Sequence, residues 1–92
     1  MSDAIRQVRA VYEGEVQGVG FRYAARGIAN RLGVAGGVED LNDGSVKLVA
    51  EGPEDLLRQL LLQIRVSRLG PHITNERIEW GEAQGLSGFY YR

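Results

Sequence analysis

The chain has 92 residues, the size of one domain, and its 11 basic and 12 acidic residues leave a net charge of −1. This balance excludes a bulk electrostatic attraction to nucleic acid or to anionic lipid. The absence of cysteine excludes disulfides, zinc–thiolate sites and thiol nucleophiles, and no apolar run is long enough to act as a signal peptide or to cross a bilayer. We therefore expect a single cytoplasmic domain over residues 1–92.

The first part of the chain changes from a strand pattern to a helix pattern. Residues 5–16 alternate between polar and apolar side chains, which predicts a half-buried strand. From residue 21 the apolar side chains follow helical spacing, at Phe21, Ala24, Ala25, Ile28 and Leu32. Gly33 suits the position after a helix C-terminus, because glycine adopts a positive φ at little cost. This pattern predicts a strand, a glycine-rich turn and a helix.

A hairpin follows the first helix. Strands are predicted at residues 34–41 and 45–51, and the turn sequence Asn42-Asp43-Gly44 joins them. In the second of these strands one face is apolar, with Val46, Leu48 and Ala50. The other face carries Ser45, Lys47 and Glu51.

A second helix is predicted to begin at Gly52-Pro53-Glu54-Asp55, because proline suits the first helical turn and acidic residues there interact favourably with the helix dipole. Its apolar stripe consists of Leu57, Leu60, Leu61 and Ile64, and Gly70-Pro71 stops it. Ile78 and Trp80 indicate a fourth strand, and residues 89–92 a short final one.

The order β-α-β-β-α-β, with a short fifth strand at the C-terminus, predicts the fold class. Two right-handed crossovers place both helices on one face of an antiparallel sheet, which is the ferredoxin-like α+β sandwich. This plan hosts many unrelated functions, so the function must be argued from a site.

The turn between the first strand and the first helix has the residues of an anion site. Gly18 and Gly20 allow successive backbone N–H groups to form a concave nest, and the free amides of a helix N-terminus carry a partial positive charge. Arg22 adds a planar guanidinium that matches phosphate oxygens. On these grounds alone, an oxyanion site and a plain tight turn with a solvated arginine remain equal alternatives.

Two other kinds of site have weaker support. Asp40, Asn42 and Gly44 resemble part of a calcium loop, but Ser45 stands where that loop requires glycine, and a hairpin turn explains these residues better. An RNA-binding sheet would need aromatic side chains on its outer face, and Lys47, Val49 and Glu51 offer none. We therefore expect no nucleic-acid partner.

The segment from residue 14 to residue 60, GEVQGVGFRYAARGIANRLGVAGGVEDLNDGSVKLVAEGPEDLLRQL, closely resembles the acylphosphatase family. The family's first signature is similar to G-x-V-Q-G-V-x-F-R, and residues 14–22 match it throughout. The second is similar to G-x-V-x-N-x-x-D/K-G-x-V followed by a strand ending near Gly-Pro-Glu. It is matched at Gly36, Val38, Gly44, Val46 and Gly52-Pro53-Glu54. The ending SGFYYR also resembles the family's closing strand.

The resemblance implies an enzyme that hydrolyses the carboxyl–phosphate bond of acyl phosphates without a metal ion or a cofactor. It implies that the loop binds the phosphate through Gln17, Gly18, Val19, Gly20, Phe21 and Arg22. It further implies that the catalytic residues are Arg22, which holds the phosphate oxygens, and the residue at position 40, which positions the water. The expected partner is a small acyl phosphate or inorganic phosphate, bound by a monomer that contacts no membrane.

The sequence departs from the family pattern at Asp40, where the family has an asparagine, and at Gly37, where tryptophan is common. An ionised aspartate only accepts hydrogen bonds, and two like unit charges about 5 Å apart repel by about 3 kcal/mol at an effective dielectric constant of 20. Three consequences are open: weak activity at neutral pH, general-base catalysis by Asp40, or a non-catalytic domain that binds anions or other proteins. Asn42 is a further candidate to replace the asparagine.

Overall fold

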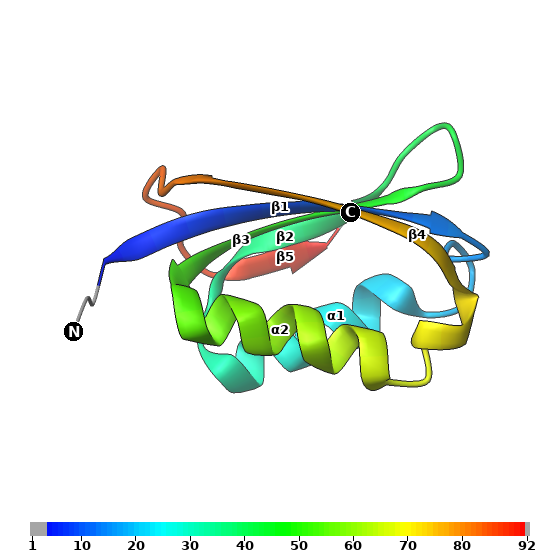
Figure 1. Ribbon diagram of the computed structural model, residues 1–92, viewed down its shortest axis with the longest axis horizontal. Helices are drawn as coiled ribbons and strands as arrows, with labels where there is room; N and C mark the ends of the chain where they lie inside the picture. The colour runs from blue at the N-terminus through cyan, green and yellow to red at the C-terminus, as the bar shows by residue number, and fades with distance from the viewer. Residues whose placement is uncertain (1–3, 92) are drawn as a thin grey trace.

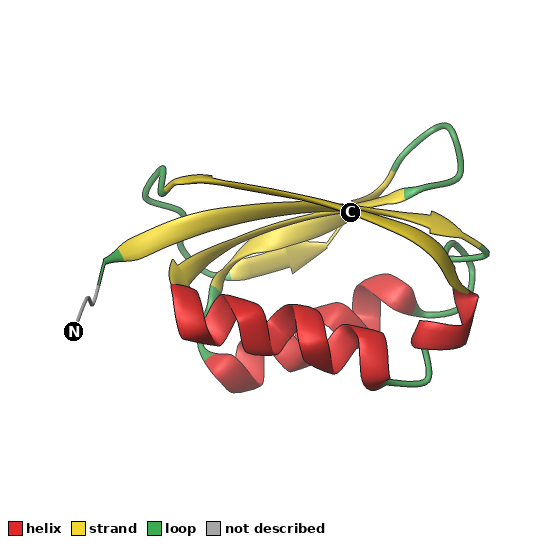
Figure 2. Cartoon of the chain, viewed as in Figure 1, coloured by secondary structure: helices red, strands yellow, loops and turns green. Residues whose placement is uncertain are grey.

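Two helices cover one face of a five-stranded sheet in the computed structural model, which describes residues 4–91 (Figure 1). The elements in chain order are β1 (Ile5–Gly14), α1 (Phe21–Leu32), β2 (Ala35–Asp40), β3 (Val46–Pro53), α2 (Glu54–Val66), a 3₁₀ turn (Gly70–His72), β4 (Ile73–Glu82) and β5 (Phe89–Tyr91). The order confirms the predicted ferredoxin-like α+β plan, and Figure 2 shows both helices below the sheet. Residues 1–3 and Arg92 of the predicted domain lie outside the described residues.

The strands lie in the order β4-β1-β3-β2-β5. The pairs β1–β3, β1–β4 and β2–β3 are antiparallel as predicted, but β5 pairs in parallel with β2, so the sheet is mixed. The reason is geometric: the chain leaves β4 at the end of the sheet where β1 begins and reverses direction there. A strand antiparallel to β4 runs in the same direction as β2.

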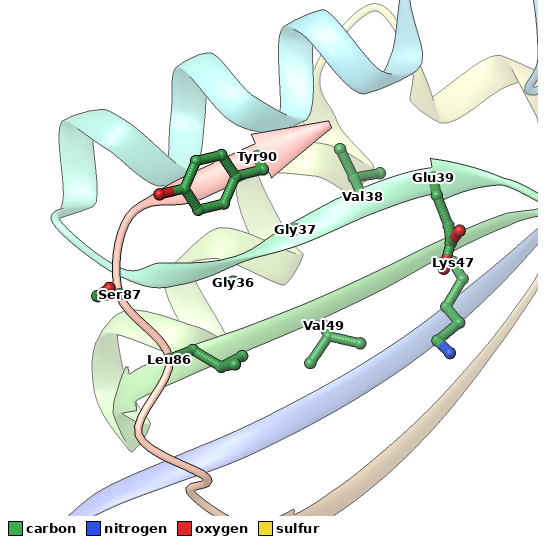
Figure 3. Close-up of a pocket in the computed structure, with 9 residues that line it drawn as sticks. All are labelled: Gly36, Gly37, Val38, Glu39, Lys47, Val49, Leu86, Ser87 and Tyr90. Carbon is green, nitrogen blue, oxygen red and sulfur yellow. The ribbon is translucent and has the colours of Figure 1, made fainter. Parts of the chain in front are cut away.

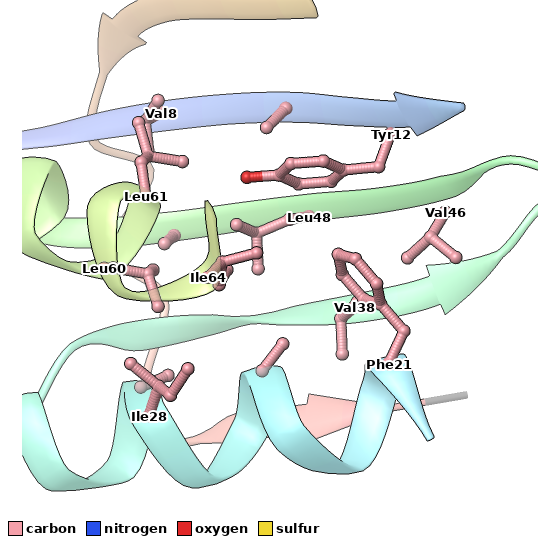
Figure 4. Packing of buried hydrophobic residues seen from close by; sticks show 14 of the residues in the cluster. Val8, Tyr12, Phe21, Ile28, Val38, Val46, Leu48, Leu60, Leu61 and Ile64 are labelled. Carbon is pink, nitrogen blue, oxygen red and sulfur yellow. The ribbon is translucent and has the colours of Figure 1, made fainter. Parts of the chain in front are cut away.

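The core confirms the apolar faces that the sequence predicts (Figure 4). The sheet contributes Val8, Ala10, Tyr12, Val46, Leu48 and Ala50, none of which is exposed. The helices contribute Phe21, Ala25, Ile28 and Ala29 from α1 and Leu57, Leu60, Leu61 and Ile64 from α2. Burial of these two stripes against one face of the sheet provides the apolar area that stabilises the fold.

β1 and α2 end at least two residues earlier than the sequence predicts. β1 ends at Gly14 rather than at residue 16, because Gly14 has a φ of +124° and passes so close to the His72 carbonyl oxygen that a Cβ would lie 2.3 Å from it. α2 ends at Val66 rather than at Gly70-Pro71, because the Ser67 hydroxyl and N–H both donate to the Ile64 carbonyl, at 2.7 and 3.3 Å.

The topology brings three strand ends together. Both β1 and β2 are antiparallel to β3, and β5 is parallel to β2, so β1, β2 and β5 all run in the same direction. Their C-terminal ends therefore lie at one edge of the sheet, and the loop from β1 to α1 starts at this edge. Residues from the loop, from the end of β2 and from the end of β5 can then meet in one site.

Candidate active site

The loop of residues 15–20 carries the chain from β1 to the N-terminus of α1. Gly18 and Gly20 have φ values of +78° and +79°, which glycine adopts without strain. Gly20 immediately precedes Phe21, the first residue of α1, and no side chain caps this helix end. A helix N-terminus without a side-chain cap presents backbone donors to a ligand, and left-handed glycines next to it form the concave nest that binds anions.

Gln17 ties the loop to the β2–β3 hairpin. Its side-chain amide donates hydrogen bonds to the carbonyl oxygens of Leu41, at 2.7 Å, and Ser45, at 2.9 Å. Within the hairpin, Asp43 Oδ1 accepts from the Ser45 N–H at 2.9 Å and from the Ser45 hydroxyl. These two donors from Ser45, the hydroxyl first, lower the pKa of Asp43 below its ordinary value. These hydrogen bonds stabilise the hairpin turn and attach the hairpin to the loop. They therefore set the position of Asp40 relative to Arg22.

A cavity of about 220 Å³ lies between the loop, the end of β2 and the end of β5. Its lining residues are Val16, Gly18, Gly20, Phe21, Arg22, Tyr23, Asp40 and Tyr91. The structure thus brings together Gly18, Gly20, Phe21, Arg22 and Asp40 from the sequence-predicted set. Two members of that set, Gln17 and Val19, are not among the lining residues. The volume equals that of several water molecules, which is enough for a phosphate group.

Arg22 and Asp40 form an ion pair in the lining of this cavity. Arg22 Nε lies 3.4 Å from Asp40 Oδ1, and the two side chains are 37% and 28% exposed. Both charged groups are therefore accessible to a small ligand. In the absence of a ligand, the Asp40 carboxylate offsets part of the positive charge of Arg22.

The sequence indicates no role for Tyr91, although the SGFYYR ending resembles the family's closing strand. Its ring lies 5.8 Å from the guanidinium carbon of Arg22 and 5.2 Å from that of Arg26. Contacts of this kind orient a guanidinium over the ring face. Tyr91 therefore helps to hold two positive charges at the edge of the cavity. Only the parallel pairing of β5 with β2 places it there.

Arg68 is a second residue without a sequence-based assignment. Its Nη1 donates a hydrogen bond of 2.8 Å to the Val19 carbonyl, across 49 residues of sequence. The sequence places Arg68 near the end of the predicted second helix, which says nothing about the loop that it contacts. Arg68 therefore adds a positive charge beside the loop.

Two buried side chains of the sheet, Tyr12 and Glu51, have shifted pKa values but do not line this cavity. Burial, followed by the nearby Glu76 carboxylate, raises the pKa of the Tyr12 hydroxyl, and the Tyr12 ring packs 5.0 Å from the Phe21 ring. Burial alone would raise the pKa of Glu51, but hydrogen bonds from the N–H groups of Gln84, Leu86 and Gly85 and from the Gln7 side chain lower it overall. Glu51 therefore remains ionised inside the protein.

A second cavity lies on the outer face of the sheet (Figure 3). It has a volume of about 330 Å³ and is lined by Gly36, Gly37, Val38, Glu39, Lys47, Val49, Leu86, Ser87 and Tyr90. Its charged groups, Glu39 and Lys47, are directly opposite each other on β2 and β3. This cavity has no arginine and no free helix end, so it lacks the donors that make the first cavity an anion site.

Within residues 4–91, no three histidine or acidic side chains are grouped so that they could hold a metal ion. No helix in the same range is long and apolar enough to cross a membrane.

Comparison with known proteins identifies relatives of the whole domain. The family model Acylphosphatase matches residues 8–90. The chain is 43% identical to an acylphosphatase of Corynebacterium efficiens, over 99% of this chain and 95% of the relative. It is 40% identical to one of Thermus thermophilus, over 88% and 92%. Among solved structures, an acylphosphatase from Bacillus subtilis superimposes with a TM-score of 0.86 at 30% identity, covering 95% of this chain and 98% of that one.

Proposed function

Because the chain belongs to the acylphosphatase family, we propose that it hydrolyses acyl phosphates in the cavity between the 15–20 loop, Arg22 and Asp40. The observation that carries this proposal is the convergence of a glycine nest, an uncapped helix N-terminus and a guanidinium on one cavity. All three features favour the same ligand, a phosphate dianion.

In the proposed complex, the phosphate group lies against Gly18 and Gly20 and the first amides of α1. Arg22 donates to its oxygens through the guanidinium fork, which suits phosphate better than a point charge would. The acyl group then extends towards Tyr23 and Tyr91, the exposed aromatic residues of the lining. Of the predicted binding residues, Gln17 and Val19 contribute by holding the shape of the loop, through the contacts with the hairpin and with Arg68.

In the proposed reaction, a water oxygen forms a bond to phosphorus as the bond from phosphorus to the acyl oxygen breaks. The acyl oxygen leaves with the electron pair as a carboxylate, and the proton of the water passes to the phosphate product or to solvent. A carboxylate is a good leaving group that needs no proton, so positioning and charge stabilisation are sufficient for catalysis. The loop amides and Arg22 stabilise the charge that develops on the phosphoryl oxygens.

Asp40 has two opposing effects in this scheme. Its carboxylate can accept a hydrogen bond from the attacking water and so orient it. It also repels the phosphate dianion and competes with it for Arg22, 3.4 Å away. We expect the repulsion to dominate at neutral pH, so that the activity is lower than an uncharged residue at this position would allow.

The test is the release of inorganic phosphate from a simple aryl acyl phosphate, with a chelator present. The wild type should release phosphate. Arg22→Ala should lower kcat/KM by at least about 100-fold, because it removes the two charge-assisted hydrogen bonds of the guanidinium fork, which contribute about 1.5–3 kcal/mol each. Arg9→Ala is the matched control, since Arg9 lies on β1 and pairs only loosely with Glu79, at 3.8 Å. Equal activity of Arg22→Ala and the wild type would place the chemistry elsewhere.

The ion pair between Arg22 and Asp40 also favours a second candidate function, a non-catalytic domain that binds phosphate or another anion. Because the Asp40 carboxylate pairs with Arg22, a bound anion can displace this carboxylate reversibly. Phosphate that perturbs the loop amides in the wild type, without hydrolysis of any acyl phosphate by the wild type or Asp40→Asn, would favour this candidate.

A further inference from the structure

Arg68 contacts the loop of residues 15–20, here called the phosphate loop, on the side away from the cavity. It follows the end of α2 by two residues, and its guanidinium Nη1 donates to the Val19 carbonyl oxygen at 2.8 Å. The same guanidinium lies against Gly20: a Cβ built on Gly20 would be 3.0 Å from Arg68 Nη2. Arg68 is absent from the lining of the cavity that holds Arg22 and Asp40, and it lines instead a groove between α1 and the end of α2.

The geometry of the peptide bond gives this contact a consequence in the cavity. In a trans peptide, the C=O of one residue and the N–H of the next point in opposite directions, and the described residues contain no cis peptide bond. Arg68 holds the Val19 C=O on the groove side. The Gly20 N–H, which belongs to the same peptide unit, is therefore directed to the other side, and Gly20 lines the cavity.

We propose that Arg68 is a positioning residue for the phosphate loop: it fixes the Val19–Gly20 peptide so that the Gly20 N–H donates to the bound phosphate. The proposal extends the function proposed above and assigns Arg68 no contact with the substrate. A flexible glycine loop can rotate this peptide by changing ψ of Val19 and φ of Gly20, which would point a carbonyl oxygen at the phosphate. A charge-assisted hydrogen bond to the carbonyl oxygen disfavours that rotation.

Three variants separate the hydrogen bond from the charge. Arg68→Met keeps an unbranched apolar stem and removes both the donor and the charge. Arg68→Lys keeps the charge with a single-point donor, and Arg68→Gln keeps a donor without the charge. Arg31→Met is the control, because Arg31 lines the same groove but lies in the last turn of α1, away from the loop.

The experiment is a titration with inorganic phosphate followed by amide chemical shifts, together with kcat and KM for an aryl acyl phosphate and a thermal scan of each variant. In the wild type the Gly20 amide proton should move downfield on phosphate binding. Arg68→Met should lose most of this shift, with phosphate affinity and kcat/KM about 5- to 20-fold lower and an unfolding midpoint close to that of the wild type, because the Arg68 side chain is exposed. Arg68→Lys should recover more than Arg68→Gln, and Arg31→Met should resemble the wild type.

Two results would overturn the role of Arg68. One is an unchanged Gly20 shift and phosphate affinity in Arg68→Met. Another is a loss of affinity in Arg31→Met as large as in Arg68→Met, which would show that only charge in the groove matters. If the wild type binds phosphate but releases none from an acyl phosphate, the proposed function fails, and the titrations still decide the role of Arg68.

Discussion

Asp40 and Glu51 lie on the neighbouring strands β2 and β3, and their carboxylates have opposite environments. Glu51 is 4% exposed and accepts hydrogen bonds from the Gln7 side chain and from the backbone N–H groups of Gln84, Gly85 and Leu86, at 2.6–3.0 Å. Asp40 has a side chain that is 28% exposed and a long contact with Arg22, at 3.4 Å. The first carboxylate is saturated with donors, whereas the second borders a cavity.

The difference distinguishes a structural carboxylate from one in a candidate site. Glu51 fastens residues 84–86 to the outer face of β3, and this segment leads into β5, which carries Tyr91 to the cavity. Asp40 keeps unused acceptor capacity, which a water molecule or a ligand donor can occupy.

The largest effect is expected for Glu51→Ala. The substitution removes a buried acceptor of four hydrogen bonds and releases the segment before β5, so we expect a loss of about 2–3 kcal/mol of unfolding free energy. For a domain of this size the unfolding midpoint should fall by about 10–20 °C. Thermal unfolding followed by circular dichroism measures it. A midpoint within a few degrees of the wild type would show that the four bonds contribute little.

The stabilisation by Glu51 should also depend on pH. The folded protein holds the pKa of Glu51 below the value in the unfolded chain, so its contribution is complete above the ordinary glutamate pKa and is lost as pH falls through the folded value. Urea unfolding of the wild type and Glu51→Gln at a series of pH values isolates this group from the other carboxylates. The difference in unfolding free energy should be large at pH 7 and should narrow in acid; a constant difference would contradict the assignment.

An intermediate effect is expected for Asp40→Asn, and it should change the rate of hydrolysis rather than the stability of the fold. Removing the charge weakens the competition for Arg22 and abolishes the repulsion of phosphate, while the amide still offers an acceptor for the water. We expect acyl phosphate hydrolysis at pH 7 to rise by about tenfold, equivalent to about 1.4 kcal/mol. A slower Asp40→Asn enzyme would instead assign Asp40 as a general base. Glu39→Gln, on the outer face of β2, controls for the loss of one negative charge near the hairpin.

The smallest effect is expected for Glu54→Gln. This carboxylate contacts two arginines, Arg6 at 2.6 Å and Arg58 at 2.7 Å, and these contacts, that of Arg6 first, lower the pKa of Glu54. The side chain is 39% exposed, however, and exposed ion pairs contribute little to stability. Its unfolding midpoint should change far less than that of Glu51→Ala. An equal change would mean that the number of charged partners, and not burial, decides the contribution of a carboxylate.

The sequence alone predicted every element whose signal is local. The apolar stripes of α1 and α2, the Asn42-Asp43-Gly44 turn and the left-handed Gly33 after α1 need only neighbouring residues, because helical and strand periodicity repeat over a few positions. The glycine loop with Arg22 was recognisable for the same reason. The family resemblance added Asp40 as a catalytic candidate, whereas the local pattern indicated it only as part of a partial calcium-loop likeness.

The tertiary structure decided which distant groups meet. Glu51 was expected on an outer face with Lys47, yet it is buried, because residues 84–86 cross that face and supply three backbone donors. The direction of β5 depends on where the chain leaves β4, and this direction places Tyr91 beside Arg22. Arg68 reaches Val19 only because α2 ends beside the loop. Proximity between residues that are 49 positions apart leaves no period in the sequence, so only the packed fold could show these contacts.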